Sequence, residues 1–272
     1  MTERTPSPSP LRSELLSQYP GLVHGVTRKV PGMGAADGNV GDTEPRDFAD
    51  AWEMRKCWSA AIGFDPERIV RTGQIHENGV FVVKQEHAGM GRRRDTPTPA
   101  QADAMITNAV EVPIMTLAAD CLPLLMYDPV QRAVAAVHAG WRSTVLDIAG
   151  ETVRAMQREF GSNPAVLVAF LGPAIGVCCN EVGSEVTAAW RKIASDLGDT
   201  AEIAVTRPSV KEHFDVPLAN KLLLERAGLK SENIELSDIC TKHNLNDWFS
   251  HRGQGAATGR QGGVIMLTEA GA

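Results

Sequence analysis

The sequence predicts an α/β fold in which at least one pair of neighbouring strands is antiparallel. Apolar runs of strand length alternate along the chain with segments whose apolar residues recur at helical spacing. At the centre of the chain, two apolar runs at 121–127 and 132–137 are separated only by Asp128-Pro129-Val130-Gln131. Asp and Pro favour turns, so this segment predicts a β-hairpin, and a purely parallel doubly wound sheet is not expected.

The length and composition indicate one domain. The chain has 272 residues, of which 43% are hydrophobic, and neither an internal repeat nor a linker divides it. Residues 1–12 begin with alternating Ser and Pro and carry little to bury, so we expect a disordered lead-in there. We expect residues 13–272 to form that single domain.

Charge and hydropathy limit the partners. The net charge of −6 and the pI near 5.7 argue against nucleic acid, because binding to a phosphate backbone normally requires a basic face. No run approaches the roughly 20 apolar residues of a membrane helix, and the N-terminus lacks a signal pattern. The five cysteines form no Cys-x-x-Cys pair, so free thiols are expected. We therefore expect a cytoplasmic protein, a monomer or small homo-oligomer, that binds small molecules.

The elements before the hairpin follow from apolar spacing and stop signals. A short strand lies within the glycine-rich segment that begins at Gly21. A helix is expected over 47–62, because its apolar residues recur at helical spacing and Gly63 follows. Strands are expected at 69–72, 80–83 and 103–107. Between the last two, the loop 86–102 carries Arg92-Arg93-Arg94, which is either a solvated face or a lid over an anionic substrate.

The elements after the hairpin follow the same logic. Ser143 or Thr144 is expected to cap a helix that runs to Phe160, with Gly161 as its stop. A buried strand over 166–171 and an amphipathic helix over 184–197 come next, and a strand over 263–267 closes the chain. The Gly140 turn and the exposed amides of the first helical turn form a natural anion site, with Arg142 as a charged clamp.

The predicted hairpin places a thiol opposite an imidazole. If the turn occupies 128–131, opposed residues have numbers that sum to 259, which pairs Cys121 with His138. Opposed Cβ atoms lie roughly 4.5–5.5 Å apart, so a metal ion could bind both side chains. A bulge or Pro123 could shift this register. The alternative is a buried Cys beside a hydrogen-bonded His.

Two strings at this hairpin resemble a known family. AADCLPLLMYD and AAVHAGWRS resemble the YfiH-like proteins, also called laccase-domain or polyphenol-oxidase-like proteins and regarded as purine nucleoside phosphorylases. The resemblance extends over about residues 20–268, including a strand at 213–215, a helix at 217–227 and a strand end at Cys240. It implies a single α/β domain with β-sheets sandwiched between helical layers.

The resemblance also implies a set of site residues. Gln74-Ile75-His76 resembles the family's Gln-x-His step, which adds His76 to Cys121 and His138 as a third metal ligand. Matching segments imply catalytic roles for these three residues and Arg142, and substrate-binding roles for Arg28, Asn39, Gly172 and Arg252. The chain departs from the family pattern at Asn180, His251 and Gly253, where specificity could differ.

Three functions remain open at this point. The resemblance implies a zinc enzyme that converts adenosine, inosine or methylthioadenosine and phosphate to the free base and a ribose 1-phosphate derivative, with adenosine deamination as a second activity. The alternatives are a copper-dependent polyphenol oxidase and a cysteine amidase that edits peptidoglycan precursors, with Cys121 as nucleophile. Two His and one Cys with an open fourth position match catalytic zinc. Copper stays possible, although seven scattered histidines cannot supply several copper centres.

Overall fold

The computed structural model describes residues 7–208 and 210–269. Its α-helices are α1 Phe48–Ile62, α2 Trp141–Thr144, α3 Ile148–Phe160, α4 Ser184–Ile193, α5 Val216–Arg226 and α6 His251–Gln254. Its strands are β1 Leu22–Val26, β2 Val80–Val82, β3 Ala104–Thr107, β4 Ile114–Ala118, β5 Leu122–Asp128, β6 Ala133–Ala139, β7 Val168–Leu171, β8 Glu181–Val182, β9 Val205–Thr206, β10 Glu212–Phe214, β11 Ile234–Leu236 and β12 Gln261–Leu267. In these ranges no helix is long and apolar enough to cross a membrane.

The strands form three sheets. The largest has six strands in the order β11-β7-β5-β6-β3-β2, and the two others have the orders β1-β12-β4 and β8-β10-β9. The β5–β6 hairpin lies at the centre of the six-stranded sheet and is antiparallel, whereas β11 with β7 and β2 with β3 are parallel pairs. The sheet is therefore mixed, as the hairpin predicted.

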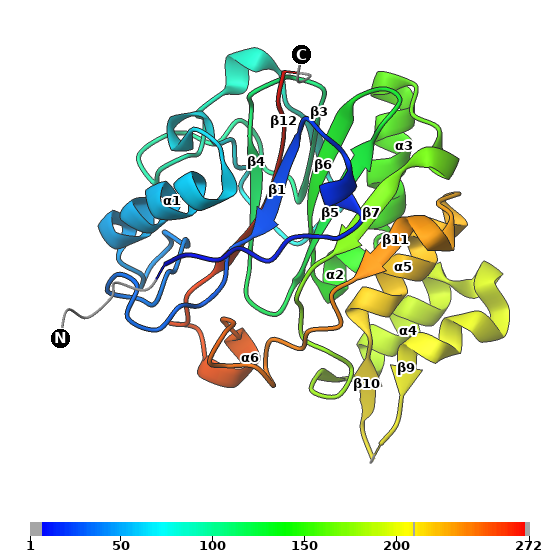
Figure 1. Cartoon of the computed structure of the whole chain (residues 1–272). Coiled ribbons are helices and arrows are strands. Elements are labelled where there is room, and N and C mark those ends of the chain that lie inside the picture. The colour runs from blue at the N-terminus through cyan, green and yellow to red at the C-terminus, as the bar shows by residue number, and fades with distance from the viewer. Residues whose placement is uncertain (1–6, 209, 270–272) are drawn as a thin grey trace.

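The layers follow from which faces are apolar. Figure 1 shows α1 outside the β1-β12-β4 sheet, and α3 and α5 outside the six-stranded sheet. Leu124 and Met126 of β5 pack in the core under α3 and α5, while Leu125 and Tyr127 pack toward the β1-β12-β4 sheet. Both faces of β5 are covered, which explains why its sequence is a continuous apolar run. The predicted single α/β domain, with sheets sandwiched between helical layers, is confirmed.

Helix α1 begins and ends where the sequence places it. The Asp47 side chain accepts hydrogen bonds from the amides of Ala49 and Asp50, and Gly63 adopts the left-handed conformation after the last turn. Trp58 and Ile62 are buried, and Trp58 Nε1 donates to the carbonyl of Gly38. Helix α1 thereby covers the outer face of the β1-β12-β4 sheet.

The hairpin register differs from the predicted one by two residues. Leu122 pairs with Ala139 and Asp128 with Ala133, so paired numbers sum to 261 and the loop spans residues 129–132. Asp128 closes the loop from inside β5, because its Oδ1 accepts from the amides of Val130 and Gln131. A shift of two keeps every side chain on its predicted face. Cys121 therefore lies diagonal to His138 instead of directly opposite.

Three other predictions need correction. The helix expected from Ser143 or Thr144 is broken into α2 and α3, because Asp147 adopts a left-handed conformation with φ of 63°. Residues 69–72 form only an isolated bridge, Val70 with Ile114. Residues 1–6 of the expected lead-in lie outside the described ranges, whereas Leu11 pairs with Val26 by backbone hydrogen bonds.

Candidate active site

Three sequence-predicted residues meet at the edge of the six-stranded sheet. His76 comes from the loop before β2, Cys121 directly precedes β5, and His138 lies near the end of β6. One ligating atom of each lies within 4.8 Å of the other two. The two imidazole rings lie edge to face, with centroids 4.9 Å apart. His138 is buried, Cys121 is half-buried and His76 is exposed.

Asp103 fixes the two histidines relative to each other. Its Oδ1 lies 2.8 Å from His138 Nδ1, which leaves Nε2 of that ring to face Cys121. Its Oδ2 accepts from the amides of Ile75 and Glu77, on either side of His76. Asp103 is fully buried, so its hydrogen bond to His138 is shielded from water. Residue His76 has φ of 62°, a conformation that this backbone anchoring holds in place.

Gly140 gives the cluster its close packing. A Cβ atom at this position would lie 3.1 Å from Cys121 Sγ and 3.1 Å from His76 Cδ2. Any larger residue would push one of the two side chains away from the cluster. The Gly140 amide donates to Ser143 Oγ, so it is already satisfied by the protein.

The cluster favours an ionised thiol. Burial alone would raise the pKa of Cys121, but His138 and His76 outweigh burial and lower it to about 6. Burial alone would lower the pKa of His138, but Cys121 and Asp103 raise it to about 9. A thiolate is the form of cysteine that binds metals and attacks electrophiles. The group can therefore hold a metal or act as a nucleophile and base.

The cluster opens into a cavity of about 910 Å³. Its wall includes five arginines against three carboxylates: Arg71, Arg93, Arg94, Arg252 and Arg260, with Asp42, Glu44 and Asp120. Apolar surface comes from Leu117, Trp141, Ile175 and Val216. A cavity of this size with apolar surface and a cationic wall suits a small anionic or phosphate-dependent substrate.

One side of the wall is a buried ion-pair network. Asp42 accepts two hydrogen bonds from Arg71 and one from the fully buried Arg55. Although burial raises the pKa of Asp42, the two guanidinium groups outweigh it and lower it to about 2. Arg71 is thus fully engaged, and its role at the cavity is to hold the wall.

Arg260 is differently placed. Within the described ranges, only its Nη1 is hydrogen-bonded, to the carbonyls of Thr258 and Gly259. Burial and the neighbouring Arg46 lower its pKa to about 10, so it stays charged at neutral pH. Asn39 Oδ1 accepts from the Arg260 amide at 2.7 Å. Asn39 itself does not line the cavity, and its contact is with the backbone of a residue that does.

Asp120 anchors another part of the wall. This buried residue precedes Cys121, and its carboxylate accepts from Thr241 Oγ1 and from the Arg252 amide. The Arg252 side chain lines the cavity and donates to the carbonyls of Cys179 and Glu181. Asn180 and His251, two departures from the family pattern, also line this wall.

Besides Asn39, three predicted site residues lie away from the cavity lining. Arg142 is exposed and stacks on the Trp141 ring, 4.4 Å from its centroid. Arg28 forms an ion pair with Asp247 at 2.5 Å. Gly172 packs against Pro123 and lines a separate, smaller cavity. Arg93 and Arg94 reach the cavity rim, but they are held there by ion pairs to Glu67 and Glu44.

The sequence reasoning missed Asp103, Asp120 and Arg260 as site residues. Asp103 and Asp120 each lie within two residues of a strand end, beside apolar runs, and such acidic positions are a usable signal for residues that orient ligands. Arg260 carries no comparable signal, because only folding brings β12 beside the cluster.

A mixed α/β sandwich with a His₂Cys group at the base of a charged cavity defines a class of enzyme. The chain belongs to the family described as multi-copper polyphenol oxidoreductase laccase, whose model matches residues 24–268. It is an enzyme of that family, and the YfiH-like resemblance is confirmed.

Relatives with curated names give two activities. The chain is 31% identical to a purine nucleoside phosphorylase of Bacteroides thetaiotaomicron, over 93% of this chain and 94% of that one. It is 32% identical to "Adenosine deaminase RL5" of an unknown prokaryotic organism, over 85% and 88%. The crystal structure of the Bacillus licheniformis hypothetical protein YfiH superposes with a TM-score of 0.88 at 30% identity, covering 97% of this chain and 98% of that one.

Proposed function

We propose that this enzyme is a zinc-dependent purine nucleoside phosphorylase that also deaminates adenosine. The observation that carries the proposal is the His76, Cys121 and His138 group at the base of the arginine-lined cavity. The names of the relatives supply the two reactions. Adenosine, inosine and methylthioadenosine are the proposed substrates, together with phosphate, and a cytoplasmic location stays a prediction.

The ligand set fits zinc. Two imidazoles and a thiolate provide three ligands, and the cavity side remains for a fourth, as in catalytic zinc sites. Asp103 holds His138 through Nδ1, which is the usual arrangement behind a metal-binding histidine. When bound, zinc would supply a Lewis acid that activates water and polarises oxygen ligands.

The residues of the cavity would bind and orient the reactants. The apolar surface of Trp141, Ile175 and Val216 suits a purine base. Arg260 presents a charged group with unsatisfied donors in the same cavity, so it is the better candidate for binding phosphate than the exposed Arg142. Holding phosphate and nucleoside together would convert a bimolecular reaction into one between oriented neighbours.

Copper is the alternative that the family description suggests. All seven histidines lie in the described ranges, and only His76 and His138 share a ligand group with each other. Laccase chemistry needs several copper centres, which this arrangement does not supply. Metal quantification distinguishes a single copper ion in the group of His76, Cys121 and His138 from zinc.

A cysteine hydrolase is the second candidate, favoured by one observation. Cys121, His138 and Asp103 are connected in the order nucleophile, base and orienting carboxylate. In that case Cys121 would attack an amide, such as one in a peptidoglycan precursor. Such an enzyme would be inactivated by a thiol-alkylating reagent and would not require a metal.

One panel tests the proposed function. Protein of known metal content is incubated with adenosine, inosine and methylthioadenosine, with and without phosphate, and free base, ribose 1-phosphate and inosine are measured. We expect base release only with phosphate, and its loss after chelation and in His138→Ala but not in His87→Ala. Phosphate-independent base release, or full activity in metal-free protein, would overturn the proposal.

A further inference from the structure

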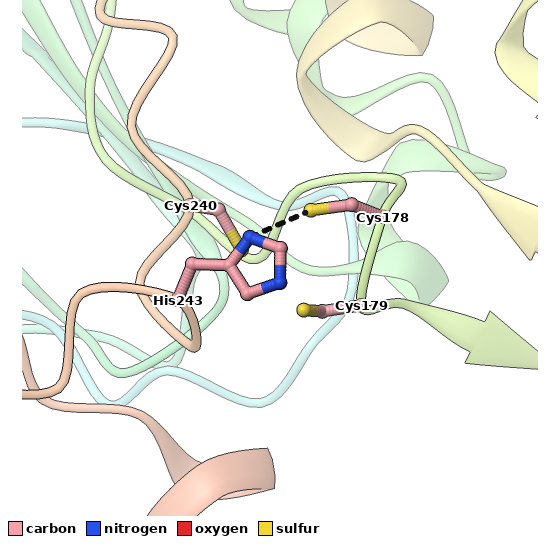
Figure 2. Close-up of side chains that lie close together, drawn as sticks. All are labelled: Cys178, Cys179, Cys240 and His243. Carbon is pink, nitrogen blue, oxygen red and sulfur yellow. Dashed lines mark hydrogen bonds between the residues drawn. The ribbon is translucent and has the colours of Figure 1, made fainter.

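A second group of metal-binding side chains lies outside the cavity lining of the candidate active site. Cys178, Cys179, Cys240 and His243 each offer one ligating atom, and these four atoms lie within 4.8 Å of one another. Figure 2 shows the three cysteine side chains arranged around the His243 ring, with Cys178 Sγ 3.5 Å from His243 Nδ1. All three thiols are free, so no disulfide joins them.

We propose that Cys178, Cys179, Cys240 and His243 form a structural zinc site. Three thiolates and one imidazole complete a tetrahedron without leaving an open position, which distinguishes structural from catalytic zinc. Ligand atoms of a tetrahedral zinc site are separated by roughly 3.8 Å, given bonds of about 2.3 Å, so small side-chain rotations are sufficient to close the present arrangement. Thiolate ligands select zinc over magnesium or calcium.

The local backbone supports this assignment. Cys240 and His243 are three residues apart in a turn, within the spacing of paired zinc ligands. The Gly176 amide donates to Cys240 Sγ at 3.2 Å. Amides that point at a sulfur stabilise its thiolate form. Lys242 near Cys179 would offset part of the negative charge of three thiolates.

The two halves of the site come from loops that the fold already brings together. Ala174 forms an isolated parallel bridge with Cys240, and the Thr241 amide donates to the Ala174 carbonyl. One loop runs on to Asn180 and the other to Arg252, both of which line the catalytic cavity. A bound zinc ion would therefore cross-link the two loops behind that wall, without touching the substrate.

The number of thiols also matters. Any disulfide among three thiols would leave one of them unpaired, whereas a zinc ion can bind all three together with His243. The fifth cysteine, Cys57, is exposed on α1 and belongs to neither ligand group. It provides a matched control within the same chain.

Cobalt titration of metal-free, reduced protein tests the proposal, because each thiolate bound to Co²⁺ adds charge-transfer absorption. We expect the wild-type chain to bind two equivalents of Co²⁺ through four thiolates, one from Cys121 and three from the second group. The Cys178→Ser/Cys240→Ser variant should bind one equivalent of Co²⁺ through Cys121 alone, with about three quarters less charge-transfer intensity. Cys57→Ser should match wild type, and His76→Ala/His138→Ala should keep the intense spectrum. A single equivalent in wild type, lost from the His76→Ala/His138→Ala variant, would overturn the site.

Alkylation of the wild-type protein removes any dependence on a folded variant. Zn²⁺ should slow modification of Cys178, Cys179 and Cys240 at least tenfold, as measured by mass spectrometry of peptides. Cys57 should react equally with and without Zn²⁺. Equal rates at the three cysteines in both conditions would contradict the proposal.

Discussion

Asp103 Oδ1 lies 2.8 Å from Nδ1 of His138, and the same carboxylate accepts the two amides that flank His76. One buried side chain thus sets the orientation of both histidines, although it does not touch the cavity. This makes Asp103 a positioning residue whose removal should loosen the ligand group without removing a ligand.

Asp103→Asn should lower zinc affinity about 10- to 100-fold, because an amide binds the imidazolium or imidazole N–H more weakly than a carboxylate does. The measurement is competition with a chelator of known affinity. Asp128→Asn is the matched control, since Asp128 is also fully buried but caps the hairpin loop. Equal affinities for Asp103→Asn and wild type would show that the hydrogen bond does not position the ligands.

Arg260→Ala should raise the KM for phosphate about 10- to 100-fold, the effect of losing a charged hydrogen bond of about 1.5–3 kcal/mol. Arg142→Ala should change it by no more than about twofold, because Arg142 is exposed and stacked on Trp141. Initial rates over a range of phosphate concentrations measure both. The reverse order of effects would restore the clamp role that the sequence assigned to Arg142.

His24 should make the fold sensitive to mild acid. Its Nε2 accepts from the Ser13 amide, its Nδ1 is buried without a partner in the described ranges, and burial together with Arg12 lowers its pKa to about 4. The unfolded chain protonates this residue near pH 6.5, so its stabilising contribution is complete above that pH and is lost as pH falls from 6.5 toward 4. The free energy of unfolding should drop by about 2 kcal/mol between pH 7.5 and 5 on this account.

The control for His24 is a pair of variants. Denaturant unfolding of His24→Gln should show a smaller drop over this pH range, whereas His251→Gln, at an exposed position, should follow wild type. A drop of the same size in His24→Gln would assign the acid sensitivity to other groups.

The sequence was sufficient for features that depend on local chemistry. Asp47 and Gly63 bound α1 because capping and left-handed glycine are local effects. The hairpin followed from Asp128 and Pro129, and its two-residue shift arose because Asp128 stays in the strand while closing the loop. The split between α2 and α3 depends on Asp147, whose side chain binds Arg154 and Arg226, and such distant pairing leaves no local signal.

The candidate site was predictable only in part, for a related reason. Cys121 directly precedes β5 and His138 lies on the neighbouring β6, so apolar spacing could bring them together, whereas His76 needed a family resemblance. Arg260 directly precedes β12 and Asp103 directly precedes β3, so the order of the strands in the sheets, which is a long-range property, brings them to the site. Cys178 and Cys240 come close because a single parallel bridge, between Ala174 and Cys240, joins their two loops, and no sequence pattern predicts such a bridge.

The last prediction concerns competition between the two proposed reactions. In our proposal both use the same ligand group and the same cavity, and the described residues hold no second ligand group that opens into it. Deamination consumes water at C6 of adenine, whereas phosphorolysis requires phosphate at C1′ of the ribose. Phosphate held by Arg260 would occupy space that the deaminating water needs. Rising phosphate should therefore inhibit inosine formation from adenosine while increasing adenine release.

His76→Ala or His138→Ala should abolish both activities together, and Cys121→Ser should retain part of both. Deamination that is indifferent to saturating phosphate, or that survives in His138→Ala, would instead identify a separate or contaminating deaminase.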